Sequence, residues 1–152
     1  MTRVNATTKL LITLLWACLG LGGVTAPQEP ARPAFAAYDV FVDSGSAALG
    51  AWQFEWVVRG GGARIVGVEG GEHPAFAQAP YYDPAALQGG RILIAAFSTA
   101  KDLPHGRTRV ARVHLMVDPG AAPQFAVQLQ ACADGAGADL SAGVAWQKME
   151  SK

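Results

Sequence analysis

The sequence predicts an all-β domain, built as an antiparallel sandwich of two sheets with about seven to nine strands. Three observations predict this fold. Residues 51–58 read Ala-Trp-Gln-Phe-Glu-Trp-Val-Val, and their period of two is typical of a strand with one face in a core. Similar runs follow, separated by Gly, Pro and Asp. Almost no stretch between these runs has the spacing of a helix.

The first three expected strands occupy residues 37–43, 51–59 and 63–69. Alternation in the third predicts that Val66 and Val68 share a face. A run of three glycines separates the second strand from the third. This short break allows either a hairpin or a crossing from one sheet to the other.

The next two expected strands occupy residues 91–98 and 107–118. Both faces of the first are apolar, which predicts a central strand buried on both sides. The second alternates, so that Arg112 and His114 are expected to face outward. Its inward residues are expected to be Ala111, Val113, Leu115 and Val117.

The last two expected strands lie on either side of Asp134-Gly135, a strong turn signal. The inward residues expected in the first are Phe125, Val127, Leu129 and Ala131, with Gln124, Gln128 and Gln130 outside. The second strand is marked by Leu140, Ala142, Val144 and Trp146.

Residues 1–26 have the pattern of an export signal. Arg3 and Lys9 give the start a positive charge, and residues 10–24 are uncharged and mostly apolar. This apolar run is shorter than the roughly 20 residues of a membrane-spanning helix. We therefore expect an extracytoplasmic protein that is secreted, periplasmic or lipid-anchored at the envelope.

Three outcomes for this leader stay open. Val24-Thr25-Ala26 offers small residues for simple cleavage, although the proline that follows disfavours it. Leu15-Trp16-Ala17-Cys18 resembles a bacterial lipobox with a bulky tryptophan, in which Cys18 would be lipidated. The third outcome is an uncleaved anchor. Outside the leader the single cysteine is Cys132, so neither an internal disulfide nor a zinc site of several cysteines is expected.

The rest of the chain divides into a Pro-rich linker (27–36), the folded domain (37–147) and a polar tail (148–152). A length of 152 residues fits one domain. Lys plus Arg and Asp plus Glu number 12 each, so the formal net charge is zero. Such a chain has no basic field for nucleic acid, and we expect membrane contact only through the leader or a lipid anchor.

Several blocks follow one another in a recognisable order. They are Gly50-Ala51-Trp52-Gln53-Phe54-Glu55-Trp56, Ile65-Val66-Gly67-Val68, Gly90-Arg91-Ile92-Leu93-Ile94-Ala95-Ala96-Phe97-Ser98, and Leu103-Pro104-His105-Gly106 leading into Val110-Ala111-Arg112-Val113-His114-Leu115. Their order resembles the cohesin domain and the related carbohydrate-binding sandwiches, over residues 38–146. The resemblance implies a jelly-roll sandwich and a non-catalytic extracytoplasmic binding module.

The chain departs from cohesins at one turn. Cohesins usually carry an aromatic-Asp-Pro turn after the second strand, where this chain has Arg59-Gly60-Gly61-Gly62. Tyr82-Asp83-Pro84 occurs later instead. The resemblance therefore assigns no individual binding residue.

Residues 70–90 form the longest irregular segment and hold the candidate ligand-binding residues. A long loop in a compact domain is often functional. The candidates are His73, Phe76, Tyr81, Tyr82 and Asp83. Aromatic rings can stack on sugars, so the expected partner is a polysaccharide or a protein. The alternative is that these rings cap the open end of the sandwich.

Two groups of metal-ligand residue types occur in glycine-rich turns. The first consists of Glu69, Glu72, His73 and Asp83, and the second of Asp134 and Asp139 in the turn 134–139, where calcium is the ion to consider. Neither spacing defines a metal site. We expect a solvated loop and a hairpin turn, with no metal and no other cofactor.

No motif predicts catalysis. His73, His105 and His114 are not accompanied by a Gly-x-Ser-x-Gly, His-Glu-x-x-His or Cys-His pattern. We therefore expect a non-enzyme: an exported binding module for proteins or carbohydrates at the cell envelope. The alternatives are an assembly subunit that acts through edge-strand pairing and, third, a glycoside-active enzyme.

Overall fold

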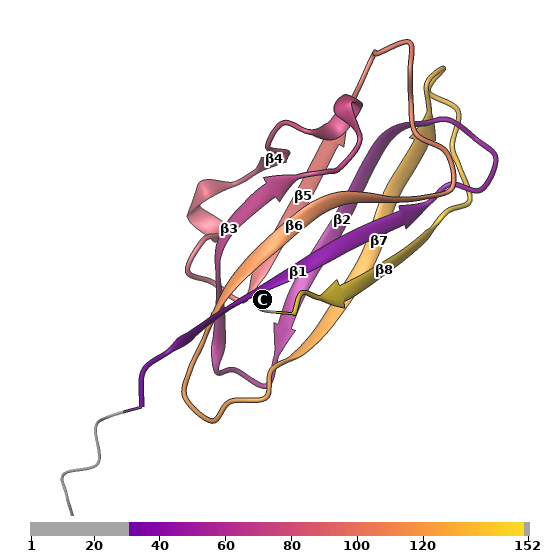
Figure 1. The fold of residues 1–152 in the computed structure, drawn as a ribbon. Helices are drawn as coiled ribbons and strands as arrows, with labels where there is room; N and C mark the ends of the chain where they lie inside the picture. The colour runs from indigo at the N-terminus through magenta and orange to yellow at the C-terminus, as the bar shows by residue number, and fades with distance from the viewer. Residues whose placement is uncertain (1–30, 151–152) are drawn as a thin grey trace, which may run out of the picture. The chain divides into compact units, whose positions relative to one another are not determined.

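Two antiparallel sheets face each other in residues 31–150, the part of the chain that this computed structural model describes (Figure 1). This arrangement confirms the predicted all-β sandwich. The strands are β1 (Ala34–Asp43), β2 (Leu49–Arg59), β3 (Ala63–Gly70), β4 (Tyr81–Tyr82), β5 (Arg91–Phe97), β6 (Arg107–Val117), β7 (Gln124–Asp134) and β8 (Gly143–Lys148). Two 3₁₀ helices, η1 (Pro74–Phe76) and η2 (Pro84–Ala86), lie between β3 and β5. The leader, with Cys18, and residues 151–152 lie outside the described residues.

The sheets have the orders β3-β6-β1-β8 and β4-β5-β2-β7. β2 and β3 therefore belong to different sheets, which settles the open alternative in favour of a crossing. The crossing uses Gly60, Gly61 and Gly62, whose φ angles are 79°, 72° and 74°. Only glycine adopts this left-handed conformation without steric cost at three successive positions.

The core lies between the sheets and is rich in aromatic rings. On β2 the inward residues Trp52, Phe54 and Trp56 are buried, as the alternation predicts. Tyr38 of β1 packs on Trp56, with ring centroids 5.7 Å apart. Phe125 contacts both rings, at 4.7 Å from Tyr38 and 5.0 Å from Trp56. These contacts join strands from both sheets.

Three β-bulges change the expected inward residues. In β6 the pairing with β1 passes from Ala111 to Arg109, and the extra residue Val110 is buried. In β3 the register with β6 shifts between Ile65 and Gly67, so Ile65 and Val68 are buried instead of the predicted pair Val66 and Val68. In β7 the pairing passes from Leu129 directly to Ala131, and Gln130 is the extra residue. The predicted inward position of Ala131 is therefore wrong, and Cys132 is buried in its place. A bulge inserts one residue and reverses the alternation beyond it.

The prediction that residues 91–98 form a strand buried on both sides is also wrong. Ile92 and Ile94 of β5 are buried, whereas Leu93 is 47% exposed and Phe97 is 65% exposed. β5 is one strand from the edge, next to the short β4. Among the described residues, no layer covers its outer side.

The ends of two predicted strands also move. β1 begins at Ala34, so the last three residues of the expected linker belong to this strand. The final strand is Gly143–Lys148, whereas Leu140 and Ala142 precede it and pack against the core. The long loop contributes β4, which accounts for an additional strand that its length allowed.

Candidate functional site

The outer face of the β4-β5-β2-β7 sheet is the candidate site. Its outward residues form rows that cross the strands, because the register of each pair places them side by side. The first row holds Phe97, Ala51 and Ala133; the second holds Tyr81, Ala95, Gln53 and Ala131; the third holds Leu93, Glu55 and Gln128. The first two rows carry no formal charge and combine two large rings with four alanines.

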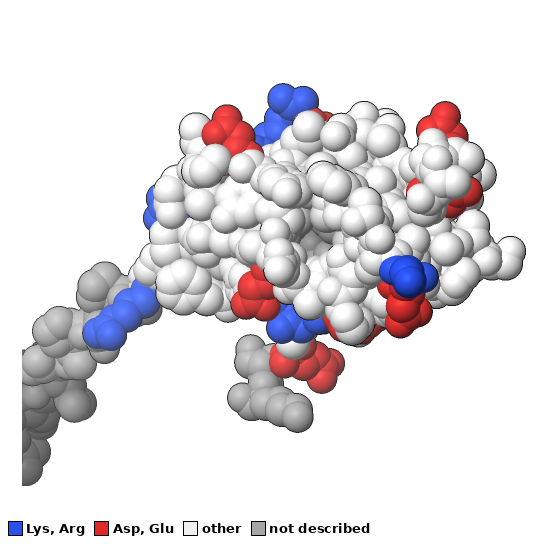
Figure 2. Space-filling model, turned by 90° about the horizontal axis from the view of Figure 1, so that it is seen from above, with Lys and Arg blue, Asp and Glu red and all other residues white. Residues whose placement is uncertain are grey.

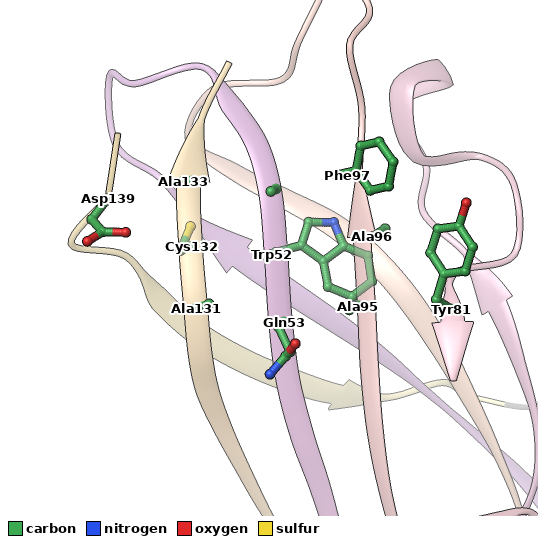
Figure 3. Close-up of a pocket in the computed structure, with 11 residues that line it drawn as sticks. Trp52, Gln53, Tyr81, Ala95, Ala96, Phe97, Ala131, Cys132, Ala133 and Asp139 are labelled. Carbon is green, nitrogen blue, oxygen red and sulfur yellow. The ribbon is translucent and has the colours of Figure 1, made fainter. Parts of the chain in front are cut away.

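Tyr81 and Phe97 are the two large aromatic rings on this face. Tyr81 is 69% exposed, and its ring lies 6.2 Å from that of Phe97, with an angle of 8° between the two planes. Beside them lies a hollow of about 230 Å³ lined by the alanines of the first two rows. Figure 3 shows the two rings on the β4–β5 side of the hollow and Asp139 on the β7 side.

Charge is sparse at this site. Arg91 of β5, which lies opposite Val57, forms an ion pair with Glu55 of the third row. The side of the molecule seen in Figure 2 is mostly uncharged, with a few acidic and basic side chains, some of them adjacent. The site therefore offers apolar area with a polar border.

The opposite outer face, on the β3-β6-β1-β8 sheet, is built differently. Asp39 accepts hydrogen bonds from Nε and Nη2 of Arg112 at 2.7 and 3.3 Å. Glu69 lies 2.8 Å from Nε2 of His114. The hydrogen bond with Asp39 raises the pKa of Arg112, although partial burial opposes the rise. Acids and bases are paired across three strands here, and the exposed Phe35 of β1 belongs to the same sheet.

The structure separates the five residues that the sequence predicted as one site. Phe76 is only 3% exposed and packs edge-on against Trp52 at 6.0 Å. Tyr82 is half-buried and packs against the core. Phe76 is therefore a core residue and offers no exposed ring to a ligand, and Tyr82 offers only part of its surface. Tyr81 alone of the three rings faces outward.

The two polar candidates, His73 and Asp83, cap the N-terminal ends of the two 3₁₀ helices. Nδ1 of His73 accepts a hydrogen bond from the Ala75 N–H at 3.2 Å and caps η1. Oδ1 of Asp83 accepts one from the Ala85 N–H at 2.9 Å and caps η2. Each side chain stabilises the start of a 3₁₀ helix with a proline in its first turn.

Sequence reasoning missed Leu93 and Phe97. The signal was present, because an entirely apolar strand places apolar residues on both faces whether or not a layer covers each face. What the sequence does not give is the position of β5 beside the two-residue β4. That position leaves its outer face open.

Two of the acidic side chains considered as metal ligands accept hydrogen bonds from the backbone. Oδ1 of Asp134 accepts from the N–H groups of Ala136 and Ala138 at 2.8 and 2.9 Å, and Oε1 of Glu72 accepts from the Arg109 N–H at 2.9 Å. Within residues 31–150 no three His, Cys, Asp or Glu side chains are grouped to hold a metal ion. The same residues include no helix with the length and apolar character needed to cross a membrane.

Comparison with known proteins supports the fold. No family model and no curated protein sequence matches this chain. One similar solved structure is the crystal structure, at pH 5.5, of a complex between a variant of CaDoc0917 and CaCohA2, a cohesin–dockerin complex. The similarity has a TM-score of 0.55 at 14% identity and covers 75% of this chain and 90% of that chain. The fold is therefore cohesin-like, as the order of sequence blocks indicated.

Proposed function

We propose that this chain is a non-catalytic protein-binding module and that it binds its partner through the outer face of the β4-β5-β2-β7 sheet. The carrying observation is the exposed pair Tyr81 and Phe97 beside a hollow lined by alanines, with the exposed Leu93 on the same face of β5. Contiguous exposed apolar area on a soluble domain marks interaction sites. Aromatic side chains are also enriched among the residues that dominate binding energy.

The distribution of polarity supports a protein partner. Tyr81 and Phe97 can enter apolar pockets of a partner, while the Glu55–Arg91 pair lies at the border. An apolar centre with a polar border is the usual arrangement of a protein interface. The fold supports the proposal as well, since the similar solved structure is a cohesin–dockerin complex.

Carbohydrate binding at the same face is the second candidate. Two exposed rings whose planes differ by 8° provide adjacent surfaces on which sugar rings can stack. The protein partner is preferred because Leu93 extends the apolar area beyond the two rings. A sugar-binding site would instead need polar groups converging on the rings, and the nearest row offers chiefly Gln53.

We also propose that the module works outside the cytoplasm, at the cell envelope. The support is the positively charged and then apolar pattern of residues 1–26. A fusion of this leader to a reporter that is active only after export would test the location. Reporter protein retained in the cytoplasmic fraction alone would contradict it.

The binding proposal is tested with the full chain, its Tyr81→Ala/Phe97→Ala variant and a matched control. Phe35→Ala is the control because Phe35 is 75% exposed but belongs to β1 of the other sheet. The probes are a panel of purified dockerin modules, proteins captured from an envelope extract and then purified, and a glycan array. Loss of two interface anchors is expected to lower the affinity for a protein partner by about 30-fold or more.

Each result decides between the candidates. A partner whose affinity falls for the double variant and not for the control supports the proposed face. Equal affinity for all three proteins places the interface elsewhere. Glycan binding that disappears in the double variant, without any protein partner, favours the second candidate.

A further inference from the structure

The two sheets have four edge strands, and two of them are protected by their surroundings. The edge of β3 is covered by the loop after η2: the Ile65 N–H donates to the Gly89 carbonyl at 2.9 Å, and the Gln88 N–H donates to the Ile65 carbonyl at 2.7 Å. β4 has only two residues and lies between Pro80 and Pro84. Neither edge offers a long row of backbone groups to another strand.

The other two edges differ from each other in length and in sequence. β8 has six residues and ends with Lys148, and short edges with a lysine resist pairing. β7 has 11 residues, and its segment 124–133 contains no proline and no charged residue. β7 is therefore the long edge that lacks these protecting features.

Part of β7 is already covered on its outer side. The Leu140 N–H donates to the Cys132 carbonyl at 2.8 Å, and the Asp134 N–H donates to the Ala138 carbonyl at 2.9 Å. The remaining residues, 124–131, pair with β2 alone among the residues that the structure describes. The bulge at Gln130 leaves residues 124–129 as the regular free edge.

The register identifies the backbone groups at this free edge. The Val58 N–H donates to the Gly90 carbonyl at 2.6 Å, on the β5 side of β2. Phe125 lies opposite Val58 on β7. In an antiparallel pair such residues point their backbone groups away from each other. The N–H and C=O groups of Phe125, Val127 and Leu129 therefore point outward from the sheet.

We infer that a second copy of this chain pairs with this edge, β7 against β7, in antiparallel orientation about a twofold axis at Val127. A row of unpaired backbone N–H and C=O groups can form hydrogen bonds with an extended strand of another chain. The twofold pairing places Phe125 opposite Leu129 of the second copy and Ala126 opposite Gln128, so apolar residues meet on the inner side. The segment carries no charge and the chain is neutral, so no net repulsion opposes self-association.

The register follows from two constraints. Residues directly opposite each other in a ladder have side chains on the same face. The twofold axis must therefore lie between one residue and the same residue of the second copy, and not between two successive residues. Moving the axis to Ala126 would place Leu129 opposite Pro123, which has no N–H to donate. An axis at Val127 uses all three outward residues of each copy. The paired sheets also turn their outer faces to the same side, which would present two copies of the candidate site together.

Cysteine pairing between two different variants tests this arrangement. One full chain carries Ala126→Cys and the other Gln128→Cys, both with Cys18→Ser and Cys132→Ala. The two positions face each other in the proposed dimer as a non-hydrogen-bonded pair, at a Cα separation that suits a disulfide. Mild oxidation of the mixture is expected to give roughly fivefold more disulfide dimer than either variant alone, because like positions are offset.

The edge of β8 provides the matched control. Ala145→Cys mixed with Gln147→Cys, in the same background, places cysteines on an outer face beside the protected edge. Dimer yield from the β7 mixture that does not exceed its separate variants, or that the β8 mixture equals, overturns the inference. Sedimentation supplies a second readout: Ala126→Lys/Gln128→Lys is expected to abolish the dimer by repulsion, and Ala145→Lys/Gln147→Lys to leave it. A dimer that survives the first pair also overturns it.

Discussion

Replacing Trp56 with alanine is expected to lower the free energy of unfolding by about 4–5 kcal/mol. Trp56 is fully buried between the sheets. Its ring contacts those of Tyr38, Phe125 and Trp146, with centroid distances of 5.7, 5.0 and 6.1 Å. Truncation to alanine removes all three ring contacts and leaves a cavity where strands of both sheets meet. The expected loss of unfolding free energy is therefore near the upper end of the range for a buried tryptophan.

Urea unfolding followed by circular dichroism measures this loss. With an m-value of about 1.5 kcal/mol per M for a domain of this size, the midpoint is expected to fall by about 3 M. A domain whose whole stability is about 5–15 kcal/mol would then be close to unfolding without denaturant. A midpoint that moves by less than about 0.5 M would refute the assignment of Trp56 to the core.

Trp56→Phe separates ring packing from hydrogen bonding. The indole N–H of Trp56 is buried and has no acceptor among residues 31–150. Phenylalanine keeps a ring at the site and removes this donor, so a loss of only about 1–2 kcal/mol is expected. A loss as large as that of the alanine variant would show that packing of the whole indole ring, which phenylalanine does not fill, determines stability at this site.

Three further outcomes are expected. Phe76→Ala should cost about 3–5 kcal/mol of unfolding free energy in urea and Tyr81→Ala under about 1, because Phe76 is core and Tyr81 is exposed. Gly70→Ala should destabilise by over about 2 kcal/mol, since a Cβ would press on backbone carbonyls of Ala77 and Gln78, whereas Gly143→Ala, in open space, should be neutral. Burial raises the pKa of the Cys132 thiol above its ordinary value of 9.0. The thiol therefore ionises more readily in the unfolded chain, and the free energy of unfolding should fall as the pH rises past 9. Urea unfolding at several pH values should show a smaller fall for Cys132→Ala.

The alternation of the sequence was sufficient to predict the class of fold and most of the core. Trp52, Phe54 and Trp56 were placed correctly because β2 alternates without interruption between residues 52 and 58. Val66 and Ala131 were misplaced because a bulge depends on how the partner strand is aligned. A single strand carries no record of that alignment.

The candidate site was predicted less well, for a related reason. Clustering of His73, Phe76, Tyr81, Tyr82 and Asp83 in the sequence suggested one surface, yet β4 sends Tyr81 outward and Tyr82 inward. The η1 turn sends Phe76 into the core. The partner of Tyr81 is Phe97, sixteen positions away in the chain, and only the β4–β5 pairing brings them together.

The two outer faces of the sandwich differ in the contacts that a partner would have to displace. On the β3-β6-β1-β8 sheet, Arg112 pairs with both Asp39 and Glu69, so a partner that displaced these contacts would have to replace them. On the β4-β5-β2-β7 sheet, burial of Tyr81 and Phe97 removes apolar area from water without breaking any ion pair. This difference supports the proposal that a partner binds the second face. The free edge of β7 belongs to that same sheet, so the proposed self-pairing would extend the proposed binding face and leave it uncovered.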